Sequence, residues 1–264
     1  MQRVAKRYLQ RAVLAGALTL GFPNPAAAET EWLPSGTLHP RNLADPLEPR
    51  LGLSYAPEPD HLDAALGAPI SIVSFPLSGR TFLAVVEAGL FIRLGRDGSF
   101  FPLRTVDGLF GAGLETRRGR FAGRLRLMHH SAHKADGDST VAYRDFTFSR
   151  ESWELEVSSI WDRASIYFRA GSAWHSVPED KGPAAALGGA WKGKGESSRP
   201  FAALHLQADR GREWRVSKSV LIGWEAGSRR VFRVGLKLFD GHSPRGQYWK
   251  TTESYLGIDL QFTP

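Results

Sequence analysis

The chain has no cysteine among its 264 residues, so neither a disulfide nor a thiolate metal site holds its fold. It also lacks a long apolar run, because the stretch at residues 12–22 is much shorter than the ~20 residues that a membrane-spanning helix needs. A large net charge is missing as well. Four of the 34 Lys and Arg residues lie in residues 1–28, which leaves 30 against 27 Asp and Glu. This small excess does not indicate a nucleic-acid partner.

The N-terminus has the pattern of a secretory signal peptide. Basic residues, among them Arg3 and Arg11, precede the apolar stretch, and three alanines ending at Ala28 follow it as a cleavage site. We therefore expect residues 1–28 to be removed on export, and residues 29–50, which are rich in proline and have no period, to form a periplasmic lead-in.

Residues 255–262 alternate between two faces, as a strand does when one side is apolar and the other is wet. The apolar face contains Leu256, Ile258, Leu260 and Phe262, and the other face contains Tyr255, Gly257, Asp259 and Gln261. A final strand of this kind resembles the signal by which Gram-negative outer-membrane barrels are recognised for insertion. The resemblance implies the cell outer membrane as the location and the barrel-assembly machinery as a partner.

Similar segments of about ten residues recur from residue 51 to the end, separated by Gly, Asp, Ser and Pro clusters, which is typical of a transmembrane barrel. The sequence predicts an all-β fold, a transmembrane antiparallel β-barrel of about 12 strands with a polar lumen, over residues 51–264; ten strands is the alternative. The expected strands are 50–57, 68–77, 80–94, 104–117, 119–131, 146–159, 162–174, 183–193, 199–209, 213–225, 229–240 and 251–263.

Inward-facing charges on these strands, such as Arg124, Arg126 and Glu156, predict cross-links that plug the lumen. Because the last strand of such barrels runs toward the periplasm, the short connections become periplasmic turns and the long ones extracellular loops. Tryptophans near strand ends predict aromatic girdles at the two membrane interfaces. They are Trp161, Trp174, Trp214, Trp224 and Trp249.

One strand carries a base and a hydroxyl on its apolar side. His129 and Ser131 share the face of Leu125 and Leu127, so they should lie on the outer wall near the extracellular end. A histidine beside a serine is the first requirement of an activated nucleophile. This His-x-Ser pattern resembles the active-site motif of outer-membrane phospholipase A and of the lipid A 3-O-deacylase. The resemblance implies hydrolysis of lipid acyl esters.

In those enzymes a residue of the following strand orients the histidine. Here the next strand offers Asp145 as the first candidate and Glu151 as the second, since both share the outward parity of Trp153. A second reading treats His129, His130 and His133 as metal ligands, although His129 and His130 should point to opposite faces. The sequence leaves calcium open as a cofactor.

Contacts with outer-membrane lipids and lipopolysaccharide are expected near the extracellular loops. Arg245, in the polar loop that follows Asp240, is suited to a lipopolysaccharide phosphate. The set of headgroup-binding candidates is His133, His242, Arg245 and Tyr248.

Three motifs taken together resemble an uncharacterised outer-membrane family, the domain of unknown function 1207. They are the stretch 43–50, the His129-x-Ser131-x-His133 pattern with Asp136, and the stretch 240–248. The family implies no activity. We therefore keep two functions open, a lipid acyl hydrolase and a non-enzymatic barrel that is a small channel, a structural protein or a lipopolysaccharide-binding protein.

Overall fold

The computed structural model describes residues 29–135, 147–228 and 230–264. The predicted signal peptide lies outside these residues and stays a prediction. The described part contains thirteen strands and two short 3-10 helices. They are β1 (Glu31–Trp32), β2 (Leu51–Ala56), β3 (His61–Leu77), β4 (Arg80–Gly95), β5 (Leu103–Arg118), β6 (Phe121–Lys134), β7 (Phe148–Ile160), β8 (Ala164–Val177), β9 (Pro183–Lys192), β10 (Ser198–Asp209), η1 (Arg210–Arg212), β11 (Ser217–Ala226), β12 (Val231–His242), η2 (Gly246–Tyr248) and β13 (Thr252–Thr263).

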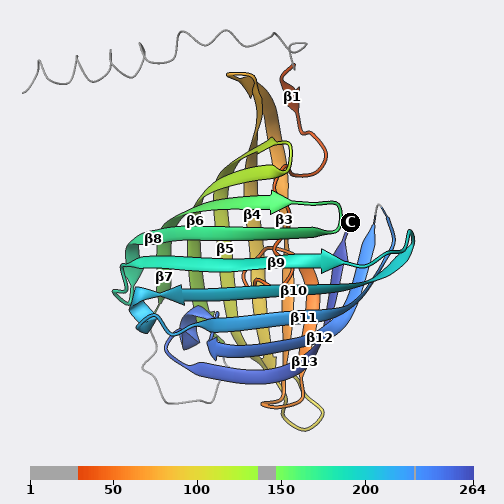
Figure 1. Cartoon of the computed structure of the whole chain (residues 1–264). Coiled ribbons are helices and arrows are strands. Elements are labelled where there is room, and N and C mark those ends of the chain that lie inside the picture. Colours follow the sequence, from red (N-terminus) through yellow and green to blue (C-terminus); the bar gives the residue numbers. More distant parts are fainter. Residues whose placement is uncertain (1–28, 136–146, 229) are drawn as a thin grey trace, which may run out of the picture.

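Strands β2 to β13 form a closed antiparallel barrel of 12 strands, which confirms the predicted fold (Figure 1). Each strand pairs with the next, and the ring closes where β13 pairs with β2, with Leu51 opposite Phe262. The short strand β1 adds to the edge of β3. Within the described residues, no helix is long and apolar enough to cross a membrane.

The predicted strands agree with the observed ones to within four residues at each end, except that β3 begins at His61 instead of residue 68. The segment that the prediction left out pairs with β2, and there Asp63 and His61 face the lumen as buried residues. Because charged residues follow the short β2, the sequence of this part of β3 resembles that of a loop.

The two faces of the wall have opposite character. On β4, Val86 and Leu90 are exposed on the outer surface, whereas Glu87 and Arg93 are buried in the lumen. The same alternation holds on β12, where Phe232 and Val234 are exposed and Arg233 is buried. The outer surface is therefore apolar and the lumen polar, as the alternation predicts.

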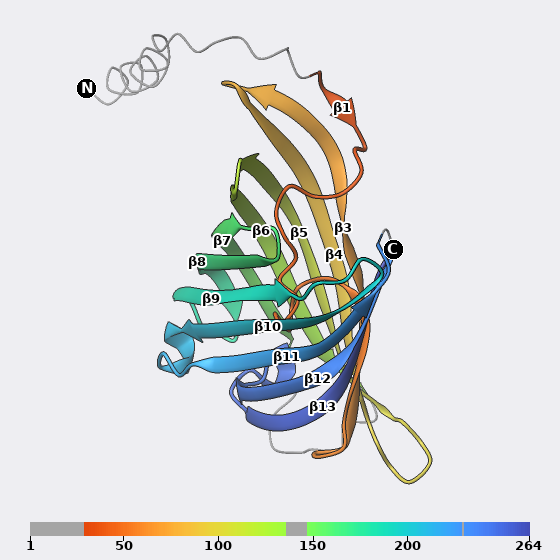
Figure 2. The ribbon, with the colours of Figure 1, turned by 45° about the vertical axis from the view of Figure 1, so that its right-hand side comes forward.

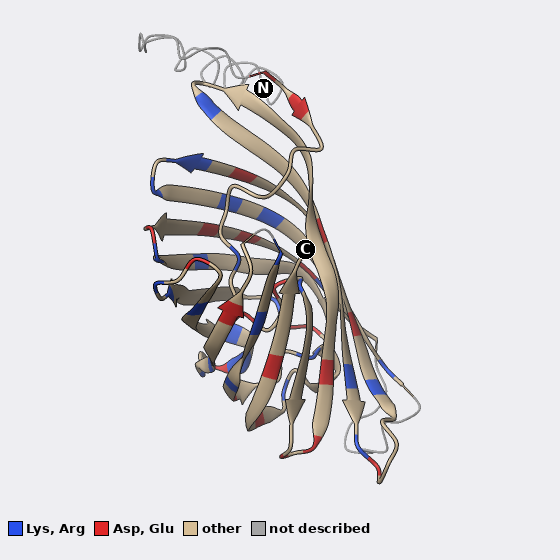
Figure 3. Cartoon of the chain, turned by 90° about the vertical axis from the view of Figure 1, so that its right-hand side faces the viewer, with Lys and Arg blue, Asp and Glu red and all other residues tan. Residues whose placement is uncertain are grey.

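Ion pairs connect the lumen residues of neighbouring strands, and Figure 3 shows Lys, Arg, Asp and Glu spread along the strands of the barrel. Arg124 on β6 lies 3.3 Å from Glu156 on β7 and 3.5 Å from Glu87 on β4. Arg126 pairs with Glu87 and with Glu154. This network confirms that these charges point inward and are paired.

The lead-in, residues 29–50, continues from β1 into the barrel, and its residues 38–50 occupy the lumen (Figure 2). Asp45 accepts a hydrogen bond of 2.8 Å from Arg169, and Glu48 accepts two from Arg124. Leu43 and Leu47 of the same segment pack on small apolar clusters of the inner wall. The sequence predicted no contacts for this segment, which supplies the lumen with both carboxylates and apolar groups.

We call the end of the barrel with the short connections, at residues 78–79, 119–120 and 161–163, the turn end, and the opposite end the loop end. Trp161 and Trp224 are exposed near the turn end, and Trp174 and Trp214 near the loop end. Trp249 was predicted to join a girdle, and this is wrong. It is buried with Ala132 and Phe148, because the connection from β12 to β13 folds into the barrel.

Candidate active site

The outer face of β6 carries His129 and Ser131 near the loop end. Strand alternation places Arg126 and His130 on the opposite, buried face, and leaves the His129 side chain 41% exposed. In the register of the sheet, His129 lies opposite Glu151 of β7, and Ser131 lies opposite Ser149. The predicted outward placement of the His-Ser pair is therefore what the structure has.

Glu151 orients the imidazole of His129. Nδ1 of His129 lies 2.9 Å from Oε1 of Glu151, across the two paired strands. When Nδ1 donates to the carboxylate, the neutral imidazole has its lone pair on Nε2, which is the atom that a general base uses. In this geometry the carboxylate of Glu151 fixes the orientation of the His129 imidazole, as it would for a general base.

Two further residues complete the surroundings of Glu151, and the sequence did not single out either of them. The Ser149 hydroxyl donates to Oε1 of Glu151 at 3.2 Å, and Nε2 of His175 lies 3.8 Å from Oε2. His175 was expected in a loop but belongs to β8, directly opposite Glu151. Only the register across three strands brings the two histidines to one carboxylate.

The Ser131 hydroxyl makes no hydrogen bond with His129 in the described part of the chain. Residues two apart on a strand are about 6.7 Å apart along its axis, so a change of rotamer is needed for contact. Gly108 on the neighbouring β5 leaves room beside the hydroxyl, because a Cβ there would lie 3.4 Å from Ser131 Oγ. Phe110 stacks on His129 with ring centroids 6.4 Å apart.

The first candidate for the orienting acid, Asp145, lies outside the described residues, as does Asp136. Glu151, the second candidate, is the one that contacts His129. The metal reading finds no support, since no three His, Asp or Glu side chains within the described ranges could hold a metal ion. His130 instead faces the lumen, with Nε2 at 2.9 Å from Asp107.

The four headgroup candidates do not form one surface. His133 is exposed on the outer face of β6, and His242 and Tyr248 are half-buried at the loop end. Arg245 is buried and lies 3.3 Å from Asp63 inside the barrel, so it does not face a headgroup. The prediction for Arg245 fails because strand periodicity does not say whether a loop turns outward or inward.

The loop that contains Arg245 contacts β6, the site strand, and the neighbouring β5 from inside the barrel. Gly246 N–H donates to Asp107 at 2.6 Å, and the Gln247 side chain donates to the backbone oxygen of Ala132 at 2.7 Å. Ala132 follows Ser131 directly. These contacts hold the loop ends of β5 and β6 from within, and no pattern in the sequence indicates them.

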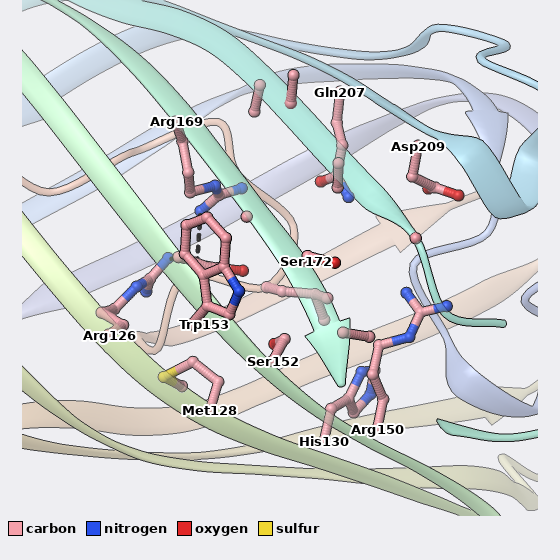
Figure 4. A pocket seen from close by; sticks show the side chains of 18 of the residues that line it. Arg126, Met128, His130, Arg150, Ser152, Trp153, Arg169, Ser172, Gln207 and Asp209 are labelled. Carbon is pink, nitrogen blue, oxygen red and sulfur yellow. Dashed lines mark hydrogen bonds and ion pairs between the residues drawn. The ribbon is translucent and has the colours of Figure 1, made fainter. Parts of the chain in front are cut away.

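A cavity of about 110 Å³ lies in the lumen behind the same strands (Figure 4). Arg126, Arg150 and Arg169 line it together with acids that include Asp209. Arg150 pairs with Asp180, and Arg169 with Asp45. These charged residues of the lining are paired, and the cavity lies inside the barrel, whereas His129 lies on its outer face.

The model of one protein family matches residues 86–263, which is more than half of the chain. That family is described as a protein of unknown function, DUF1207, and the matched part includes β6, β7 and β8 with the whole of the site. No curated protein and no solved structure matches the chain. The chain belongs to the DUF1207 family of proteins of unknown function.

Proposed function

We propose that the protein is exported with a cleaved signal peptide and inserted in the outer membrane, with the turn end in the periplasm and the loop end outside the cell. An apolar outer face supports this placement, because large apolar side chains exposed around a barrel are stable in hydrocarbon. Exposed tryptophans near both ends are suited to the two interfaces. The strand at residues 255–262 would be the segment read by the assembly machinery.

We further propose that the outer wall carries a serine hydrolase site for acyl esters of membrane lipids. The observation that carries this proposal is the 2.9 Å contact between Nδ1 of His129 and Glu151, with Ser131 on the same outer face. A carboxylate and an imidazole on an otherwise apolar outer face cost free energy unless they have a role or lie near the interface, and the pairing of the two supports a role.

In the proposed reaction, Ser131 Oγ attacks the ester carbonyl while Nε2 of His129 takes the hydroxyl proton. His129 returns that proton to the alcohol of the lipid as the ester bond breaks, which leaves an acyl group on Ser131. Water then attacks the acyl group with the same base, and the fatty acid departs. Glu151 stabilises the imidazolium in both steps.

The location of the site defines the class of substrate. At the loop end of the outer wall, a lipid can present its ester at the level of the headgroups while its chains stay in the membrane. Phospholipid and the lipid A part of lipopolysaccharide both have such esters. His133, on the same face of β6, is the headgroup contact nearest to the site in the sequence.

The alternative is a barrel without enzymatic activity. Of its forms, a channel is the least supported, because the lead-in and its ion pairs occupy the lumen. A structural or lipopolysaccharide-binding barrel is compatible with the same architecture, and it would use the polar outer residues as headgroup contacts only.

The test is fatty-acid release by the refolded barrel from phospholipid and from lipopolysaccharide, with and without calcium. Ser131→Ala should lower the release by more than about 10³-fold. Ser159 also lies on the outer face of the barrel, but on β7 at the turn end, away from the site. Ser159→Ala is therefore the matched control and should release fatty acid as the wild type does. A fluorophosphonate probe should label the wild type at Ser131. No release and no labelling by a folded barrel would refute the hydrolase and leave the non-enzymatic alternative.

A further inference from the structure

The wall of the barrel has an interruption on one side of β3. Strand β2 pairs only with residues 61–66 of β3, and β1 pairs only with Ser74 and Val73. Between them, Gly67 N–H donates to Arg50 and Leu33 N–H donates to Ile72. Among the described residues, no strand covers this edge from Ala68 to Ser71. We call this opening, residues 68–71 of β3, the window.

The sequence of β3 is suited to an uncovered edge. Pro69 has no backbone N–H, so it leaves no donor unpaired there, and proline in sheets is found at edges. Its side chain points inward but is only half-buried, unlike Asp63 and Ala65 earlier on the same face, which are buried. The inner side of the wall is therefore open to a space at this point.

That space is a cavity of about 450 Å³, within the range of about 300–1,000 Å³ that small-molecule sites have. By comparison, the lumen cavity behind β6 measures about 110 Å³. Ile70 and Phe262, which are exposed on the outer wall, line it together with Pro34 and Leu43 of the lead-in. The cavity is thus continuous with the apolar outer surface and mainly apolar itself.

Basic residues outnumber acidic residues in the lining. Arg41, Arg50 and Arg233 line the cavity, and Glu48 is the acidic side chain among the lining residues. Arg233 donates a hydrogen bond to Glu225, and Nε of Arg41 lies 3.6 Å from Oε1 of Glu48. Arg50 donates to three backbone carbonyls of the lead-in and has no carboxylate partner in the described part of the chain. An anionic group near Arg41 and Arg50 would be stabilised.

We propose that the window admits one acyl chain of an anionic phospholipid into this cavity, with the phosphate near Arg41 and Arg50. An apolar cavity that opens on the lipid-facing wall, with Arg41 and Arg50 among its lining residues, fits such an amphiphile. The proposal rests on the membrane placement proposed above, which puts the window in the periplasmic half where phospholipid is present. It does not depend on the site at Ser131.

The experiment uses the full barrel in vesicles of phosphatidylethanolamine and phosphatidylglycerol. A trace of phosphatidylglycerol carries a photoreactive diazirine at the end of one acyl chain, and the adducts are located by peptide mass spectrometry. We expect adducts on the window and on Leu43 of the lead-in. Pro69→Trp, which fills the cavity, should lower their yield about tenfold, whereas Leu66→Trp on the outer face of β3 should not.

A second pair of variants tests the charge without filling the cavity. Arg41→Gln should lower the yield with phosphatidylglycerol more than the yield with a zwitterionic probe, and Arg80→Gln, exposed at the turn end, should change neither. Migration of unheated protein in gels reports whether each variant is folded. This pair keeps the proposal testable if Pro69→Trp does not fold.

The outcomes separate the two proposals. Co-flotation with vesicles, with adducts confined to the outer wall and insensitive to Pro69→Trp, would overturn the window proposal alone. Failure to float with vesicles would overturn the membrane placement and the window proposal with it. Stronger labelling of the cavity by a lipopolysaccharide probe than by phosphatidylglycerol would assign it another occupant and overturn the phospholipid assignment.

Discussion

The two faces of β6 place basic side chains in opposite situations. On the inner face, Arg124 is buried and meets acids from the lead-in, β4 and β7, and the one from the lead-in, Glu48, is 76 residues away in the sequence. On the outer face, His129 is 41% exposed and meets one acid, from the adjacent strand. Charge inside the barrel is satisfied from many directions, whereas charge outside is satisfied only by its neighbours in the sheet.

This difference separates stability from reactivity. The nitrogen atoms of Arg124 that form ion pairs are committed to carboxylates, so they have no capacity left for a ligand. His129 uses one nitrogen for Glu151 and keeps the other for chemistry. We therefore expect variants on the inner face to change the free energy of unfolding, and variants on the outer face to change activity.

The largest effect is expected for Glu151→Gln on the outer face. It should lower kcat/KM for ester hydrolysis by about 10³–10⁴-fold, because the amide does not hold the same imidazole tautomer. Unfolding by urea should change by less than about 1 kcal/mol, as for a partly exposed ion pair. His175→Ala, whose nitrogen is 3.8 Å from the same carboxylate, is the control and should lower activity by less than about tenfold. Full activity of Glu151→Gln would contradict the assignment of the acid.

On the inner face, Arg124→Met should destabilise the barrel by about 3–5 kcal/mol, because it removes the cation that the buried Glu48 and Glu156 share. The exposed Arg118, at the turn end of β5, gives the control Arg118→Met, which should cost less than about 0.5 kcal/mol. Urea unfolding of the refolded barrels measures both. Equal losses in the free energy of unfolding for the two variants would contradict the claim that the inner-face charges stabilise the barrel more than exposed ones.

The smallest effect concerns pH and the lead-in. Burial, and then the charge of Arg124, lower the pKa of His39 to about 3. Below pH 6.5 the unfolded chain therefore binds a proton that the folded chain does not, and stability falls as the pH drops. Between pH 7 and pH 5 the loss should be about 2 kcal/mol.

The variant His39→Gln isolates this contribution. The difference in urea unfolding between wild type and variant should depend on pH in this interval, whereas His133→Gln, an exposed site, should follow the wild type. Parallel pH profiles for wild type and His39→Gln would show that His39 is protonated, or not buried, in the folded barrel.

The sequence predicted the barrel well because strand alternation is a local property. Period-two alternation assigned Val86 and Leu90 outward and Arg124 inward, and each assignment is confirmed. It also placed His129 and Ser131 on one outer face. Choosing between Asp145 and Glu151 required the register of β7 against β6, which lies across a long connection, and the structure provides it only for Glu151.

What the sequence could not predict depends on contacts between distant parts of the chain. The aperiodic lead-in has no face, so nothing indicated that Asp45 would meet Arg169 or Asn42 would meet Glu156. The inward fold of the connection after β12 misled the predictions for Trp249 and Arg245 for the same reason. The sequence did not predict the window either, because the window results from the absence of strand pairing on one edge of β3, which alternation along one strand does not report.

The closure of the ring by β2 and β13 has a consequence for the order of folding. Glu48 pairs with a residue 76 positions later, Asp45 with one 124 positions later, and Leu51 with Phe262. The closing contact between Leu51 and Phe262 cannot form before almost the whole chain is available, so the barrel cannot close around the lead-in until then. Such non-local pairing makes folding slow. A chaperone that keeps the chain unaggregated during this interval would have to act on the entire polypeptide, and not on a nascent domain.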